Sequence, residues 1–149
     1  MFDKQNIIAI GCDHGGFEMK NYLLKTLTNQ GFQWFDFGTF SSESVDYPDI
    51  IHPLAKAVSD GKYQFGIILC GSGNGVQMVA NKYTNVRAAL CWDTEQTELT
   101  RKHNNANVLS LPGRFIPFER AEEMVKLFLN TEFEGGRHAL RVDKISKTL

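Results

Sequence analysis

With 149 residues, the chain is long enough to bury a hydrophobic core as one domain over residues 1–149, without a metal or a disulfide to hold it. Hydrophobic residues make up 42% and charged residues 22%, and the formal net charge of −1 excludes a general attraction to nucleic acid or to an anionic membrane. The 3 cysteines form no C-x-x-C pair and no apolar run approaches a membrane span, so we expect a protein of the reducing cytoplasm.

Short apolar runs alternate with longer amphipathic stretches, which is typical of βαβ units that build a parallel sheet. The runs predict strands short enough to be buried on both faces of the sheet. These strands cover residues 7–11, 33–37, 65–70, 87–91 and 108–111. In such an α/β fold, ligands bind outside the carboxyl ends of the strands, so we expect the loops after the first, third, fourth and fifth strands to converge.

Helices are predicted between and after these strands. Residues 17–29 carry apolar side chains at helical spacing, and Gly31 is a candidate C-cap. Proline in the first turn favours helices over residues 48–59 and 117–130. Asp93 or Thr94 can cap a helix that runs to about residue 102.

The first strand leads into Cys12-Asp13-His14-Gly15-Gly16, which puts a carboxylate and an imidazole at the mouth of the predicted sheet. Two interpretations of Asp13 are open: it is a helix cap without a further role, or it takes part in chemistry. His14, with the glycines after it, can help to hold an anion at the start of the next helix.

The third strand ends at Cys70, directly before Gly71-Ser72-Gly73-Asn74-Gly75. Three glycines in five residues let several backbone N–H groups point at one ligand, as in an anion or oxyanion cradle. If residues 76–83 form a helix, its positive end favours thiolate over thiol at Cys70. The Ser72 hydroxyl can both donate and accept a hydrogen bond there. The alternative is a buried cysteine that simply ends a core strand.

The fourth predicted helix ends at His103-Asn104, and the chain has only 4 histidines. An imidazole can act as acid and base near neutral pH, and an asparagine can bind an oxygen, although this cationic segment can also be a plain solvated helix end. Arg114, after the fifth strand, can likewise be either a site residue or an ordinary surface arginine.

The tail contains Arg137 and Arg141, which share one face if it is helical. Two like charges four residues apart are unfavourable unless an anion lies between them, and a phosphate suits two guanidinium groups. A solvated basic tail is the alternative.

Several site classes are excluded by spacing. The glycine loop lacks the Gly-Lys-Ser/Thr ending of a Walker A motif and is not G-x-G-x-x-G. A cysteine phosphatase would need an arginine where Val76 stands. No histidine or cysteine cluster has zinc spacing, so we expect no metal.

The motifs together resemble ribose-5-phosphate isomerase of the B type, in the family that also isomerises galactose 6-phosphate and allose 6-phosphate. The matching segments follow in order between about residues 7 and 141: Gly11-Cys12-Asp13-His14, Asp46-Tyr47-Pro48, Cys70-Gly71-Ser72-Gly73, Ala80-Asn81-Lys82, Arg87-Ala88, His103-Asn104 and Gly135-Gly136-Arg137-His138. The resemblance implies a Rossmann-like three-layer α/β sandwich with a five-stranded parallel sheet and a C-terminal helical tail. It also implies no cofactor, and a homodimer or dimer of dimers with active sites shared between subunits.

By the same resemblance, Cys70 is the proton acceptor and His103 opens the sugar ring, with Asp13 and Ser72 assisting. The residues expected to bind the sugar phosphate are Asp13, His14, Tyr47, Gly71, Ser72, Gly73, Asn74, Gly75, Asn104, Arg114, Arg137, His138 and Arg141. Of these, His14, Arg114, Arg137 and Arg141 are expected at the phosphate, with His138 close by.

One departure from part of the family narrows the expected chemistry. Some members carry a glutamate base after the glycine loop, where this chain has Val76, and this leaves Cys70 as the base. Galactose-6-phosphate isomerase usually divides the motifs between two chains, so we expect the ribose enzyme, with allose or galactose 6-phosphate as the alternative substrate. A sugar-phosphate sensor without turnover and a Cys-His hydrolase are the rival functions.

Overall fold

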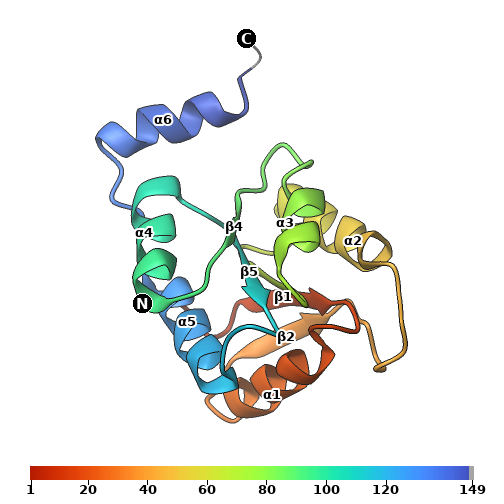
Figure 1. The fold of residues 1–149 in the computed structure, drawn as a ribbon. Coiled ribbons are helices and arrows are strands. Elements are labelled where there is room, and N and C mark those ends of the chain that lie inside the picture. Colours follow the sequence, from red (N-terminus) through yellow and green to blue (C-terminus); the bar gives the residue numbers. More distant parts are fainter. Residues whose placement is uncertain (148–149) are drawn as a thin grey trace.

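Five parallel strands form one sheet in the order β2-β1-β3-β5-β4 in the computed structural model, which describes residues 1–147 (Figure 1). The strands are β1 (Ile7–Cys12), β2 (Gln33–Asp36), β3 (Gly66–Cys70), β4 (Ala88–Leu90) and β5 (Val108–Pro112). Every residue of the two central strands β3 and β5 is buried, which explains why they are apolar without alternation.

Helices cover both faces of the sheet (Figure 1). The helices α1 (Phe17–Thr28), α4 (Thr94–Asn104) and α5 (Phe118–Asn130) lie on one face, and α2 (Tyr47–Ser59) and α3 (Asn74–Ala80) lie on the other. Alternate residues of β3 therefore enter different cores: Ile67 and Leu69 pack with α1 and α5, whereas Ile68 packs with α2 and α3. Among residues 1–147, no helix combines the length and apolar character needed to cross a bilayer.

The expected three-layer α/β sandwich with a five-stranded parallel sheet is confirmed, and the helical tail is α6 (Arg137–Ile145). Two details of the prediction were wrong. The first helix has its C-cap at Asn29, and Gly31 (φ +94°) lies in the turn that follows. The third helix was expected over residues 76–83, but it begins at Asn74 and ends at Ala80.

The early end of α3 has a tertiary cause. The Asn81 side chain accepts from the Ala88 N–H (2.8 Å) and donates to the Ala88 carbonyl (2.9 Å), and Gln77 donates to the same carbonyl (3.1 Å). Asn81 thus satisfies backbone groups on the open side of the edge strand β4. A sheet edge satisfied in this way is less available to pair with another strand.

Candidate active site

Cys70 ends β3 with its sulfur held by the loop that follows. The Gly73 N–H donates to Sγ over 3.0 Å, the residue is only 5% exposed, and the Cys70 carbonyl accepts from Gly113 (2.8 Å). An N–H group directed at sulfur favours negative charge there. The loop therefore places a backbone donor where it would stabilise a thiolate.

At the other two cysteines, burial outweighs the hydrogen bonds from Thr39 to Cys12 and from Thr97 to Cys91. Burial raises the pKa of the Cys12 thiol to about 12 and that of the Cys91 thiol to about 11. Both thiols are therefore protonated at neutral pH, when a cysteine is a poor nucleophile and a poor base. Cys70 is the cysteine that the fold equips for chemistry.

The glycine loop is fixed by backbone contacts that side chains would prevent. Gly73 has φ +74°, and a Cβ there would lie 2.6 Å from Leu90 Cδ1 and 3.0 Å from the Leu111 carbonyl carbon. The Ser110 hydroxyl donates to the Gly73 carbonyl. Ser72 is exposed, and its Oγ accepts from the Asn74 N–H (3.3 Å). The loop thus presents an exposed hydroxyl, whose proton is available to a ligand, beside a rigid backbone.

The loop after β1 meets the glycine loop, as expected. A Cβ on Gly15 would lie 2.7 Å from the Gly71 nitrogen, so the two backbones touch. Asp13 is 8% exposed, and its Oδ1 accepts from the Gly15 N–H (2.8 Å). The N-cap of α1 is Gly16, without a side-chain cap, so the alternative that Asp13 is only a helix cap is wrong.

His14 is oriented by a loop from elsewhere in the chain. Its Nδ1 accepts from the Val45 N–H at 3.2 Å. A backbone N–H can only donate, so Nδ1 carries no proton and a neutral ring carries its proton on Nε2. Sequence reasoning missed this contact, because residues 14 and 45 are brought together only by the fold.

Arg114 and Tyr47 complete this group. The Arg114 N–H donates to the Gly71 carbonyl (3.0 Å), and its side chain lies 3.2 Å from where a Gly71 Cβ would be. A Cβ on Gly75 would lie 2.6 Å from the Tyr47 ring. We call the following residues the Cys70 group: Asp13, His14, Tyr47, Cys70, Ser72 and Arg114.

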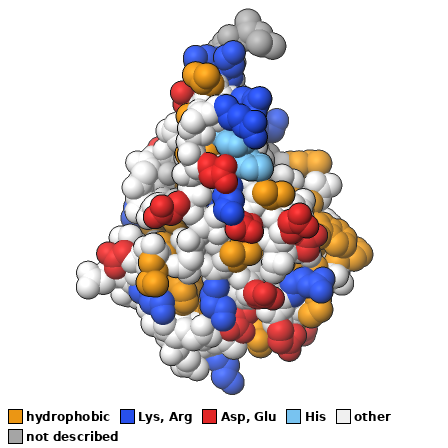
Figure 2. Space-filling view, turned by 90° about the vertical axis from the view of Figure 1, so that its left-hand side faces the viewer, with side chains coloured by type: hydrophobic (Ala, Val, Ile, Leu, Met, Phe, Trp, Pro, Cys, Tyr) orange, Lys and Arg blue, Asp and Glu red, His pale blue; other side chains and the backbone are white. Residues whose placement is uncertain are grey.

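The remaining predicted residues form a second group on α4 and α6. The rings of His103 and His138 stack with centroids 4.3 Å apart and an interplanar angle of 13°. Asn104 ends α4, and Arg137 and Arg141 are exposed on α6. We call these five residues the His103 group. Figure 2 shows histidine side chains between cationic and acidic ones on this face.

Sequence reasoning missed Glu134, whose carboxylate lies 3.7 Å from His138 Nε2. The spacing of four residues was the available signal. The pKa of His138 is lowered, first because the ring is desolvated and then because His103 and Arg137 lie near it.

The side chains of His103, Glu134 and His138 offer ligand atoms within 4.8 Å of one another. A metal ion would have to lie in the plane of both imidazole rings at about 2.0–2.1 Å from each nitrogen. Rings stacked almost in parallel do not allow that without rotation.

Within one chain, the two groups lie at opposite ends of the sheet. Cys70 is paired with Pro112 at the carboxyl end of β5, whereas Asn107 precedes the amino end of that strand. His103 and Asn104 lie just before this amino end, because α4 runs back from Asp93 for about 16 Å. Figure 1 shows α6 beyond the far end of α4, set off from the sheet.

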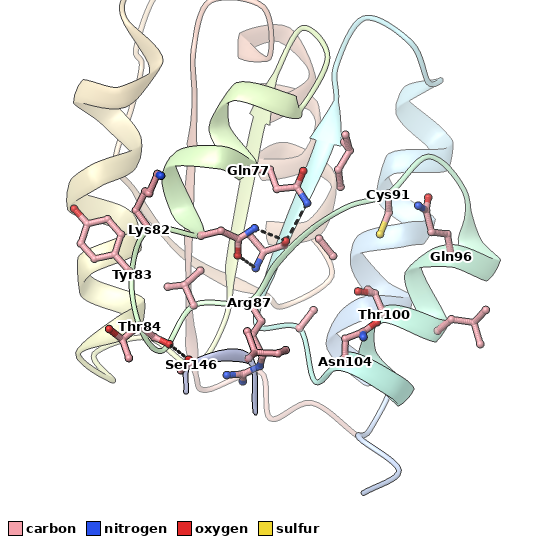
Figure 3. Close-up of a pocket in the computed structure, with 18 of the residues that line it drawn as sticks. Gln77, Lys82, Tyr83, Thr84, Arg87, Cys91, Gln96, Thr100, Asn104 and Ser146 are labelled. Carbon is pink, nitrogen blue, oxygen red and sulfur yellow. Dashed lines mark hydrogen bonds between the residues drawn. The ribbon is translucent and has the colours of Figure 1, made fainter. Parts of the chain in front are cut away.

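A groove of about 870 Å³ runs beside β4, between α3 and α4 (Figure 3). Arg87, Leu90, Leu99 and Ile145 are among its lining residues, and Cys70 is not. The Ser146 hydroxyl donates to the Thr84 carbonyl (2.9 Å) and ties the end of α6 to one side of this groove. The groove is thus separate from the Cys70 group.

Comparison with known proteins adds three findings. Residues 8–145 match the family model described as Ribose/Galactose Isomerase. The chain is 40% identical to ribose-5-phosphate isomerase B of Escherichia coli over 93% of both chains, and 43% identical to D-erythrulose-4-phosphate isomerase of Pectobacterium atrosepticum over 93% of this chain and 91% of that one.

Solved structures agree with these sequence matches. A ribose 5-phosphate isomerase from Thermotoga maritima superposes with a TM-score of 0.92 at 45% identity, covering 95% of this chain and 97% of that one. Ribose-5-phosphate isomerase B from Mycoplasma genitalium, with bound ribulose-5-phosphate, has a TM-score of 0.91 at 38% identity, covering 97% and 96%.

Proposed function

Since the chain belongs to the ribose/galactose isomerase family, we propose that it interconverts ribose 5-phosphate and ribulose 5-phosphate as a single domain over residues 1–149. The observation that carries the proposal is the Cys70 sulfur, held by the Gly73 N–H at the mouth of a parallel sheet. This sulfur can take a proton from C2 while the glycine loop faces the oxygen on which charge develops. The reaction belongs to the non-oxidative pentose phosphate pathway.

The proposed mechanism has three parts. His103 opens the furanose ring, with Asn104 on a sugar oxygen. Cys70 moves the proton between C2 and C1 through a cis-enediolate, and Ser72 relays the hydroxyl proton between O1 and O2. Asp13 orients the sugar, Tyr47 lines the pocket, and the loop 71–75, including Asn74, cradles the enediolate.

His14, Arg114, Arg137 and Arg141 bind the phosphate end, with His138 beside it. These residues come from both groups, whereas one chain keeps the groups at opposite ends of its sheet. A complete site therefore needs two copies.

We therefore propose a cytoplasmic homodimer, alone or paired into a dimer of dimers, in which the His103 group of one subunit meets the Cys70 group of the other. Two features support it. The α6 helix carries Arg137 and Arg141 away from its own sheet, and the groove beside β4 offers apolar side chains such as Leu99, which is 40% exposed. A two-fold axis makes two equal sites per dimer.

A coupled assay with ribose 5-phosphate in deuterated water tests the reaction. We expect ketose formation with deuterium at the substrate carbon. In Cys70→Ala, the rates of ketose formation and of deuterium incorporation should each fall by about 1,000-fold, because a general base contributes about 10²–10⁴ in rate. The variant should still bind the sugar phosphate. Full activity in Cys70→Ala would refute the base. Binding without any turnover in the unaltered protein would indicate a sensor, and a covalent mass shift on Cys70 would indicate a hydrolase.

The substrate is tested by comparing kcat/KM on a panel of sugar phosphates. Ribose 5-phosphate should lead. Allose and galactose 6-phosphate are the alternatives within the family, and erythrulose 4-phosphate belongs in the panel because the relative named for it is 43% identical to this chain. A higher kcat/KM on any of these three would replace ribose 5-phosphate as the assigned substrate.

A further inference from the structure

Lys20 is a buried cation that the proposed mechanism does not use. The residue is 0% exposed, although it lies in α1 between the β1 loop and the end of β2. Its Nζ donates to Asp36 Oδ1 (2.7 Å), to Asp36 Oδ2 (2.8 Å) and to the Thr39 carbonyl (2.6 Å). All three ammonium protons therefore have a partner.

These bonds hold the start of the segment 37–46, which links β2 to α2. Asp36 Oδ1 also accepts from the Gly38 N–H (2.8 Å). The same segment runs along β1, because Cys12 donates to the Gly38 carbonyl (2.7 Å) and accepts from the Thr39 N–H (2.8 Å). Lys20 and Asp36 thus fasten this segment directly beside the Cys12-Asp13-His14 loop.

The other end of the segment contacts the Cys70 group twice. Val45 donates to His14 Nδ1, and Tyr47, two residues later, packs its ring against Gly75. The residues between, 40–46, form no helix or strand. Their placement therefore depends on how the two ends are held.

A fully buried lysine paired with a partly exposed aspartate, as Lys20 is with Asp36, is seldom the most stable arrangement that a fold could adopt. Well-packed apolar residues at such a place are often as stable or more stable. A pair with this geometry can hold a backbone segment in one position, because hydrogen bonds are directional and apolar packing is not.

We propose that Lys20 and Asp36 are positioning residues for the active site: they fix the segment 37–46 so that Val45 holds His14 with its proton on Nε2. In that tautomer, His14 offers an N–H donor to the phosphate of the substrate. The phosphate role rests on the proposed function, whereas the tautomer is a property of the free protein.

The test compares the full-length protein with the double variant Lys20→Met/Asp36→Asn. This variant removes both charges, so neither is left without its partner. Lys56→Met is the matched control, because Lys56 forms an exposed ion pair with Asp60 on α2. Folding is followed by circular dichroism. Nitrogen-15 NMR of the imidazole rings of the substrate-free protein reports the His14 tautomer, and steady-state kinetics report KM and kcat for ribose 5-phosphate.

We expect a single Nε2–H tautomer in the unaltered protein and in Lys56→Met, and a mixture of tautomers in the double variant. KM should rise about tenfold with kcat within about twofold, because one oriented hydrogen bond to a charged group is lost. A folded double variant with unchanged tautomer and unchanged KM overturns the proposal. If the unaltered protein has no isomerase activity, the proposed function is contradicted. The His14 tautomer alone would then test whether Lys20 and Asp36 position His14.

Two further variants keep the test decisive. Val45→Pro removes the N–H that holds His14 and should raise KM by the same factor. Added to the double variant, it should cause no further loss, because both act through one contact. An additive loss contradicts the proposal. If the double variant does not fold, Lys20→Arg decides, because it keeps a cation opposite Asp36 and changes the geometry by which the Thr39 carbonyl is held.

Discussion

The Cys70 group and the His103 group differ in how much of the chain supports them. The Cys70 group lies at three adjacent strand ends and at the start of α2, and the backbone of Gly15 contacts those of Gly71 and Gly113 there. The His103 group lies on the end of α4 and on α6, a helix of which only His138 is buried. Figure 1 shows that helix projecting from the body of the protein.

In the proposed dimer, one half of the site is therefore preformed in each subunit, and the other half is completed when two subunits assemble. A preformed backbone cradle does not have to reorganise when charge develops in the transition state. Exposed arginines on a projecting helix gain a partner when another subunit or an anion arrives. Damage to the first half should therefore affect chemistry and folding. In the second half, loss of His103 should affect ring opening, and loss of the α6 arginines should affect substrate binding.

The largest expected effect comes from two variants, one with a mutation in the Cys70 group and the other with a mutation in the His103 group. Cys70→Ala and His103→Asn should each lose about 100- to 1,000-fold in turnover of cyclic ribose 5-phosphate. Unfolding and refolding the two together should restore about a quarter of the normal activity, since half of the dimers are mixed and each mixed dimer has one intact site of two.

The control is each variant refolded alone, which should stay inactive. A mixture without any recovery would place both groups in one subunit or separate them altogether. For an open-chain substrate analogue, His103→Asn should lose far less than Cys70→Ala, because no ring has to open. Equal losses on both substrates would contradict the ring-opening role.

The second effect concerns the arginines of α6. Arg137→Met/Arg141→Met should raise KM for ribose 5-phosphate about 100-fold with little change in kcat, because a hydrogen bond to a charged group is worth about 1.5–3 kcal/mol. Arg120→Met, which removes an exposed arginine from α5, is the control and should have no effect. A fall in kcat with unchanged KM would contradict phosphate binding by these arginines and would indicate a role in the chemical step.

The third effect compares two glycines with similar backbone angles, one in each region. Gly73 has φ +74° and no room for a Cβ, whereas Gly135 has φ +68° and nothing within 4 Å of one. Gly73→Ala should lower the free energy of unfolding by about 3 kcal/mol, from backbone strain plus overpacking. Gly135→Ala should cost only about 1 kcal/mol.

Urea unfolding at one fixed protein concentration measures both variants, because the stability of an oligomer depends on concentration. Gly61→Ala is a second control, with φ +81° and open space around it. Equal costs at Gly73 and Gly135 would show that the glycine loop is not tightly packed.

The smallest effect is the pH dependence of stability that comes from His138. Desolvation, His103, Arg137 and Arg141 lower its pKa in the folded state, and Glu134 opposes them. The unfolded chain therefore binds the proton more readily, so stability should fall as the pH drops below about 6.5 and through the lowered pKa of His138 in the folded state. His138→Gln should flatten this slope, and His52→Gln, which removes an exposed histidine bonded to Tyr83, should not. The same slope in His138→Gln as in the unaltered protein would contradict the assignment.

The elements were largely predictable because their signals are local. Each predicted strand is present, with ends that differ by no more than two residues, and Asp93 caps α4 by accepting from the Gln96 N–H as its position before the helix indicates. The end of α3 was not predictable, because Asn81 leaves the helix to bond to Ala88 on another element. Lys20 was missed for a similar reason: its spacing within an amphipathic helix does not reveal that its partner is Asp36.

By itself, the order of motifs along the chain determined the fold class and the family, because glycines, strand ends and helix caps act over a few residues. Only the tertiary structure decided that Val45 orients His14, that Lys20 and Asp36 fasten the segment beside it, and that His103 lies at the far end of the sheet from Cys70. The physical reason is distance along the chain. A hydrogen bond or a stacked ring between residues tens of positions apart depends on how strands and helices pack, and no local pattern of residue types encodes that packing.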